Sequence, residues 1–281
     1  MKKICTMIDF VMRKKYDNRK GVQIAGGRSV FDFLKKDKEI NVTKTVDEIE
    51  NAVYAYLKSY GFKKHGRTLH RFVSEDISQV IHFQSGVRGL QGHLCVNIGI
   101  RVPECDERHF QPQEEKKKYY YEYECNIRSR LGLIRGKRET WYDLHKNTEK
   151  IIKRILKEIQ ELVLPVFDIL NSRENILLYR KDYPLFDNCC NTLVLEECMI
   201  YGHLGDFQKA RELFELHYES AVAEYNDLMV NGRRLYLKKG ERVGYMGQDI
   251  TAEKNGYVTL YGASHGHIDY LDDLAERLGL K

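Results

Sequence analysis

Seven polar side chains on three predicted strands have the residue types and the spacing to bind an anion or a partner. Polar and apolar residues alternate along residues 76–84, 93–101 and 124–131, which is typical of antiparallel strands with one buried face. Successive side chains of a strand point to opposite faces of a sheet, so the polar and apolar sets separate. The polar face then gathers His82, Gln84, His93, Asn97, Asn126, Arg128 and Arg130.

Arg128 and Arg130 would supply the binding chemistry of this face. Two residues apart on one strand, they point to the same side. Two guanidinium groups can hold a phosphate or a carboxylate through paired hydrogen bonds, and the amides of Asn97 and Asn126 would add donors. The alternative is that the face is polar only because it meets water. The sequence leaves both interpretations open.

Patterns that would indicate catalysis or a metal centre are few. His265 and His267 are two residues apart at a predicted helix start, where side chains diverge, and no third ligand is spaced to join them. Cys95 and His93 share a strand face, but alternation alone explains that. No P-loop, dinucleotide-binding glycine pattern, nucleophile elbow or His-Glu-x-x-His motif occurs. We expect no catalytic residues, cofactor or metal, with an unrecognised hydrolase as an alternative.

The elements that position the polar face follow from periodicity. Apolar residues recur at helical spacing over residues 45–60, and Thr45 with Glu48 predicts a capping box at the start. A second helix is predicted over residues 147–170, with Pro165 kinking or ending its regular part. These elements predict the α+β class, with an antiparallel meandering sheet packed against helices.

The chain is expected to have three parts. Residues 1–41 form an N-terminal arm, residues 42–171 the α+β domain, and residues 172–281 an all-helical appendage. Residues 201–207 and 261–268 resemble each other and predict degenerate helix-turn-helix units in that appendage. Because a free solenoid needs three or more repeats, we expect the appendage to pack on the domain.

An insertion between the second and third strands, residues 102–122, contains three lysines followed by three tyrosines. Lysine can bind phosphate and tyrosine can stack on bases, which suggests nucleic-acid binding. Glutamates at 114, 115, 122 and 124 cancel much of the positive charge. Mixed charge runs are usually exposed, so a solvated hairpin loop is predicted.

The composition excludes several classes of protein. With 42% hydrophobic and 31% charged residues, the 281-residue chain is ordinary for a globular protein and excludes general disorder. A net charge of +5 permits a polyanionic partner without demanding one. Seven irregularly spaced cysteines predict reduced, buried thiols. No stretch approaches the roughly 18 apolar residues of a membrane span, so we expect a cytoplasmic protein without membrane contact.

Several ordered runs in the chain resemble one family. They are Gly61–Gly66, Val80–Gln84, Val96–Ile100 and Cys125–Gly132, with Arg71 among them and Trp141 and Leu164-Pro165 after them. In order and spacing they resemble the DUF4304 family over about residues 42–171. The resemblance implies an α+β fold found in bacterial proteins and, for a domain of unknown function, no catalytic residues to carry over. The chain departs from the family pattern in its tyrosine-lysine insertion, its N-terminal arm and its C-terminal segment.

The sequence therefore favours a non-catalytic cytoplasmic protein-interaction module with a protein partner. The resemblance suggests an immunity- or defence-associated role, which small bacterial domains of this sort often have. A nucleic-acid-binding protein is the first alternative, with basic residues 63–71 and 128–138 as the contact surface. Binding that weakens steeply with salt would indicate this alternative, because phosphate contacts depend on counterion release.

Overall fold

The structure is a computed structural model, and its chain divides after Glu39 into residues 1–39 and residues 40–281. The residues that it describes are 40–74, 76–108, 117–136, 141–183 and 193–280. The predicted N-terminal arm falls almost wholly outside them.

An antiparallel sheet lies at the centre of the predicted domain. Its strands are β1 (Lys63–His65), β2 (Thr68–Val73), β3 (Ile77–Ser85), β4 (His93–Arg101), β5 (Ile127–Arg130) and β6 (Tyr142–Asp143). They pair in the order β1-β2-β3-β4-β5, and β6 also pairs with β4. The α+β class and the meander are confirmed. The third predicted strand is shorter than expected, and β1 and β2 form where only a basic cluster had been recognised.

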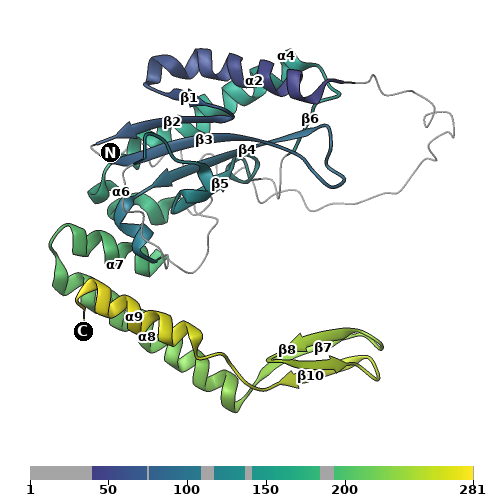
Figure 1. Cartoon of the computed structure of the whole chain (residues 1–281), viewed down its shortest axis with the longest axis vertical. Coiled ribbons are helices and arrows are strands. Elements are labelled where there is room, and N and C mark those ends of the chain that lie inside the picture. The colour runs from purple at the N-terminus through teal and green to yellow at the C-terminus, as the bar shows by residue number, and fades with distance from the viewer. Residues whose placement is uncertain (1–39, 75, 109–116, 137–140, 184–192, 281) are drawn as a thin grey trace, which may run out of the picture. The chain divides into compact units, whose positions relative to one another are not determined.

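Two helical segments pack against the apolar face of this sheet. The first is α2 (Val42–Leu57), continued by the 3₁₀ turn η2 (Lys58–Tyr60), and the second is α4 (Thr148–Glu158). Figure 1 shows both along one side of the sheet, and they contact each other. Apolar residues of α2, α4, β3 and β4 belong to one buried cluster. Burial of this cluster separates the polar face from the apolar one.

The helix starts show which side chains act as caps. The Asn41 side chain accepts a hydrogen bond from the Lys44 N–H at 3.0 Å, so α2 begins before Thr45 and the predicted capping box is wrong. The side chain of Asn147 accepts from the Lys150 N–H at 2.9 Å and caps α4, at the start of the second predicted helix.

The helix after α4 becomes irregular before Pro165. A π-helical turn, η5 (Ile159–Val163), precedes α5 (Leu164–Ile169). The Leu164 N–H donates to the Ile159 carbonyl, five residues back. The expected disturbance near Pro165 is thus confirmed, and the extra residue in the turn accommodates it.

The C-terminal part contains helices, as predicted, but it is not all helical. Its helical elements are α6 (Arg173–Tyr179), η6 (Arg180–Asp182), α7 (Leu193–His203), α8 (Phe207–Val230) and α9 (Gly266–Leu278). Between α8 and α9 lie β7 (Arg233–Leu237), β8 (Arg242–Tyr245), β9 (Gln248–Thr251) and β10 (Gly256–Leu260). β7 pairs with β10 and β8 with β9. Met246 and Gly247, which connect β8 to β9, both have positive φ, +48° and +77°, as a tight hairpin turn requires.

The predicted helix-turn-helix units have different outcomes. The first is confirmed, because Gly205, with a φ of +84°, and the N-cap Asp206 join α7 to α8. The second is wrong, because residues 261–268 follow strand β10 instead of a helix.

Charged side chains tie the C-terminal helices to the sheet region and to one another. Arg173 of α6 lies 2.9 Å from Asp76, which precedes β3, and 2.7 Å from Glu104, which follows β4. Arg180 of η6 forms an ion pair with Glu196 of α7, and their side chains are only 2% and 0% exposed. The buried apolar cluster also runs from the sheet into α7, α8 and α9. The predicted domain boundary at residue 171 therefore stays a prediction, because the buried apolar cluster of the described residues continues across it.

The cysteines and helices bear on two further expectations. Cys95, Cys105, Cys125 and Cys198 are free and buried, while the other three cysteines lie outside the described residues. Over the described ranges, no helix combines the length and apolar character needed to cross a membrane.

Candidate functional site

The strand register brings most of the predicted polar residues together. His82 of β3 lies opposite Asn97 of β4, which lies opposite Arg130 of β5, so the three form a row across the sheet. Gln84 lies two pairs along β3, opposite Cys95. We call His82, Gln84, Asn97 and Arg130 the polar window. Its membership follows from the alternation predicted above.

Hydrogen bonds hold the side chains of the polar window in place. Asn97 Nδ2 donates to Gln84 Oε1 at 2.9 Å, and the Cys95 thiol donates to Asn97 Oδ1 at 3.5 Å. His82 Nδ1 lies 2.9 Å from Thr68 Oγ1. Asn97 is buried, whereas His82 and Gln84 are half-buried. A ligand that met this window would therefore find side chains whose rotamers are already set.

His82 is a neutral group in this setting. Burial lowers the pKa of its imidazole, and the positive charge of Arg67 lowers it further. A neutral imidazole keeps one donor and one acceptor nitrogen. The window therefore combines a guanidinium, an amide pair and an imidazole that keeps one donor nitrogen, so it offers donors to a ligand that accepts hydrogen bonds.

The other predicted residues lie at the margins of this group. Arg128 lies opposite Gly99, two pairs along β5 from Arg130. His93, at the start of β4, lies opposite Asp143 of β6, and its Nδ1 is 3.2 Å from the Gln91 carbonyl. Asn126 precedes β5 and is buried, and its Oδ1 accepts from the Val102 N–H at 2.8 Å. Asn126 thus has a structural bond where a binding role had been expected.

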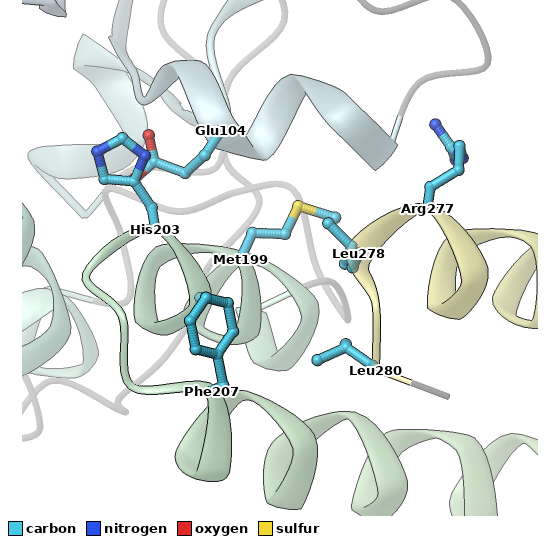
Figure 2. A pocket seen from close by; sticks show the side chains of 8 residues that line it. Glu104, Met199, His203, Phe207, Arg277, Leu278 and Leu280 are labelled. Atoms are coloured by element: carbon cyan, nitrogen blue, oxygen red, sulfur yellow. The ribbon is translucent and has the colours of Figure 1, made fainter.

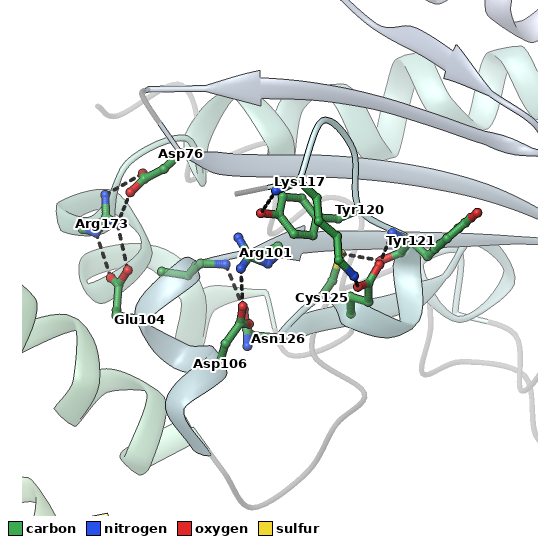
Figure 3. A network of polar contacts seen from close by, with 12 residues as sticks. Asp76, Arg101, Glu104, Asp106, Lys117, Tyr120, Tyr121, Cys125, Asn126 and Arg173 are labelled. Atoms are coloured by element: carbon green, nitrogen blue, oxygen red, sulfur yellow. Dashed lines mark hydrogen bonds and ion pairs between the residues drawn. The ribbon is translucent and has the colours of Figure 1, made fainter. Parts of the chain in front are cut away.

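Residues 117–125 lie over the neighbouring part of the polar face. Tyr119 stacks on His65 of β1, with ring centroids 3.6 Å apart. Tyr120 is 1% exposed, and the Arg101 guanidinium carbon lies 3.7 Å from its ring centroid (Figure 3). The prediction of a solvated loop is wrong for this part of the insertion. Burial of the rings against the sheet outweighs the charge of the neighbouring lysines and glutamates.

Gly99 permits the close approach of this segment. A Cβ at position 99 would lie 2.6 Å from Cys125 Sγ and 2.7 Å from Cys125 Cβ. Burial also raises the pKa of the Cys125 thiol well above its ordinary value, so this group is a packing residue. The segment therefore covers the Gly99 end of β4 and leaves the polar window beside it.

Glu122 is a neighbour that sequence reasoning placed in the solvated insertion. It begins the short 3₁₀ turn η4 (Glu122–Glu124). Burial raises the pKa of its carboxyl, and the charges of Arg128 and Arg130 oppose that rise. The positive charges of the two arginines therefore already act on a carboxyl group of this chain. No local pattern could have shown this, because it depends on how the insertion folds back.

The basic residues of the nucleic-acid alternative also have acidic partners. Lys64 and Arg67 lie 3.3 and 3.6 Å from the carboxylate of Glu50, and Arg71 lies 3.1 Å from Asp168. Arg135 forms an ion pair with Glu158. Residues 137–138 lie outside the described ranges. Sequence reasoning could not find these partners because the acids come from α2, α4 and α5.

A separate hollow lies between α7, α8 and α9 (Figure 2). It has a volume of about 240 Å³, with an apolar floor and charged groups at its edge. Its lining includes Met199, Phe207, Leu278, Leu280, His203, Arg277 and Glu104. Within the described residues there is no cluster of three or more His, Cys, Asp or Glu side chains that could hold a metal.

Comparison with known proteins gives one match. Residues 53–169 match the family described as "Domain of unknown function (DUF4304)", which confirms the resemblance found in the sequence. The matched range runs from the second half of α2 to the end of α5 and includes the whole polar window. Searches of curated proteins and of solved structures found no match.

Proposed function

From a chain whose residues 53–169 form a DUF4304 domain, we propose a non-catalytic binding protein whose polar window recognises a carboxylate on a partner protein. The observation that carries the proposal is the row of His82, Asn97 and Arg130 across three neighbouring strands. Side chains on rigid strands keep their relative positions better than side chains on loops. The row is therefore suited to recognition of a shaped surface.

Preorganisation supports binding as the task of these residues. The hydrogen bonds from Asn97 to Gln84 and between Thr68 and His82 set the side chains before any ligand arrives. A binding site that is already ordered loses less conformational entropy on association. A polar sheet face that only met water would not require this order.

Charge supports a carboxylate as the recognised group. Arg128 and Arg130 influence the carboxyl of Glu122, so the site is already matched to one carboxylate of this chain. A partner carboxylate can take the place of Glu122 with little change in the local charge. A long polyanion would instead meet Lys64, Arg67 and Arg71 in ion pairs.

Within this proposal the chain acts in the bacterial cytoplasm as an immunity- or defence-associated protein. The family resemblance supports the bacterial setting, and the residues that line the window support interaction over catalysis. The partner would then be a protein that this chain binds and restrains.

Affinity capture with three matched baits tests the proposal. The baits are the natural chain, Glu122→Gln, and Glu122→Gln combined with Arg128→Gln and Arg130→Gln. The last bait removes both arginines, and its Glu122→Gln change avoids leaving the partly buried carboxylate of Glu122 without the positive charges that act on it. A partner protein should be recovered by the first two baits and lost with the third. Circular dichroism should show that all three baits are folded.

A control and a salt titration complete the experiment. Lys150→Ala with Lys153→Ala removes two positive charges from the exposed side of α4 and should leave capture unchanged. Equal recovery of every protein by the natural chain and the arginine-free bait would contradict the proposal. Recovery of nucleic acid alone, with affinity that falls steeply as salt rises, would favour the nucleic-acid alternative.

A further inference from the structure

One face of the two-stranded sheet of β7 and β10 is not covered by the residues that the structure describes. Tyr236 lies opposite Tyr257, and Arg234 lies opposite Thr259, so these side chains point to the same side. Tyr236 is 50% exposed and Tyr257 is 65% exposed. Their ring centroids are 5.2 Å apart, and the Arg234 guanidinium carbon lies 4.4 Å from the Tyr257 centroid. We call these four residues the ribbon face.

The opposite side of the same strands is mostly apolar and turned inward, with exposed Arg233 opposite Leu260 at one end. Leu237 and Leu260 are buried, and Leu235 and Val258 are half-buried. The orientation of the ribbon face is therefore set by burial of its reverse side. The large rings of Tyr236 and Tyr257 are thus exposed, while smaller apolar side chains lie on the inward-facing side.

Positive charge gathers on this ribbon without acidic partners. Residues 233–260 contain six basic and three acidic side chains, a net charge of +3. All six basic side chains are exposed, and none forms an ion pair with another described residue: Arg233, Arg234, Lys238, Lys239, Arg242 and Lys254. In the sheet of the DUF4304 domain, by contrast, Lys64, Arg67 and Arg71 are paired with acids. The ribbon can therefore neutralise an outside polyanion without breaking internal ion pairs.

We propose that the β7–β10 ribbon binds single-stranded nucleic acid. Exposed aromatic rings offer surfaces on which bases stack, and Arg234 beside Tyr257, with the other exposed basic side chains of residues 233–260, can neutralise the phosphates. A duplex hides its base faces and could use only the charges, so the tyrosines favour a single strand. This surface is distinct from the polar window and from basic residues 63–71 and 128–138.

The proposal is tested with the full chain and fluorescently labelled oligonucleotides. Anisotropy should show binding of a 20-nucleotide oligo(dT) or oligo(U) at about 50 mM salt. Tyr236→Ala with Tyr257→Ala should weaken this binding by about ten-fold or more, because each stacked base contributes on the order of 1–3 kcal/mol. The conservative double variant to Phe should bind like the natural chain, since the rings remain.

Two controls separate stacking from folding and from exposure of tyrosine in general. Tyr123→Ala removes a ring that is 68% exposed on η4, and it should leave oligonucleotide affinity unchanged. The Ala double variant should unfold at the natural temperature, because both rings are largely outside the core.

A third variant tests the role of charge. Replacement of Arg234 and Lys238 by Gln should reduce the slope of log K against log salt by about 1.4 for a single strand.

The outcomes distinguish the proposal from other uses of this surface. Heparin is a polyanion without bases, and it should bind weakly and equally to the natural chain and the Ala variant. Unchanged oligonucleotide affinity in the Ala variant would show that charge alone acts there and would overturn the proposal. Absence of oligonucleotide binding at 50 mM salt would overturn it too, as would binding confined to vesicles containing phosphatidylserine.

Discussion

Replacement of Gly99 by Ala should destabilise the protein through contact with Cys125. The added Cβ would lie 2.6 Å from Cys125 Sγ, whereas carbon and sulfur atoms in contact are normally about 3.5–4 Å apart. Strand β4 or the segment 117–125 must therefore shift by about 1 Å. Overpacking of this kind costs about 1–3 kcal/mol. Without this contact, replacement of a strand Gly by Ala would raise the free energy of unfolding by about 0.5–1 kcal/mol. The sign of the change in the free energy of unfolding therefore shows whether the contact exists.

A double-mutant cycle measures this contact directly. Cys125→Gly removes both the Sγ and the Cβ, while Cys125→Ala leaves the Cβ that would be 2.7 Å away. Gly99→Ala should thus cost about 1–3 kcal/mol in the natural background and in the Cys125→Ala background. In the Cys125→Gly background it should be neutral or stabilising. Urea unfolding followed by circular dichroism gives the six free energies, two for each of the three backgrounds.

Reactivity of the Cys125 thiol provides a local readout. This thiol is buried at the end of the segment 117–125, where the segment meets Gly99 of β4. If Gly99→Ala lifts the segment, a thiol reagent should label Cys125 faster, as peptide mapping would show. A Gly99→Ala protein with natural stability, or the same destabilisation in all three backgrounds, would refute the placement of residues 117–125 on the sheet.

Two further predictions concern charged groups. Arg173→Met should reduce the free energy of unfolding by about 2 kcal/mol, because Arg173 donates to Glu104 at 2.7 Å and to Asp76 at 2.9–3.0 Å and its loss leaves the two carboxylates facing each other (Figure 3). Lys150→Met is the control in urea unfolding, and an equal small effect of both changes would contradict the expectation. Burial, and then neighbouring basic groups, lowers the pKa of His70, so below about pH 6.5 the unfolded chain binds more protons and stability is lost as the pH falls. His70→Phe should reduce the loss of the urea midpoint between pH 7.5 and 5.5, and an unchanged loss would show that His70 does not contribute.

The polar window could be predicted because side-chain alternation is a local property. Once residues 93–101 were recognised as a strand, Asn97 had to share a face with His93, and Arg128 with Arg130. The pairing of His82 with Asn97 then required only that consecutive strands form a meander. Helix capping by Asn147 was equally local, because the side chain bonds within one turn.

The C-terminal ribbon carried a local signal that was too short to be decisive. Residues 233–237 and 256–260 alternate between exposed and inward-facing side chains, and Met246-Gly247 can form a tight turn. Four or five residues of alternation are weak evidence beside several glycines. The pairing of β7 with β10 joins residues about twenty positions apart, which no short window displays.

The sequence by itself determined the class of the fold, the order of the main strands and the membership of the polar face. Tertiary structure decided which polar and basic side chains already have a partner in the protein. The Asn126 side chain accepts from the Val102 N–H, Lys64 and Arg67 lie beside Glu50, and residues 117–125 cover part of the polar face. The physical reason is that periodicity follows from the geometry of one strand or one helix. The partner of a charge, or the cover over a face, depends on segments that meet only when the chain folds.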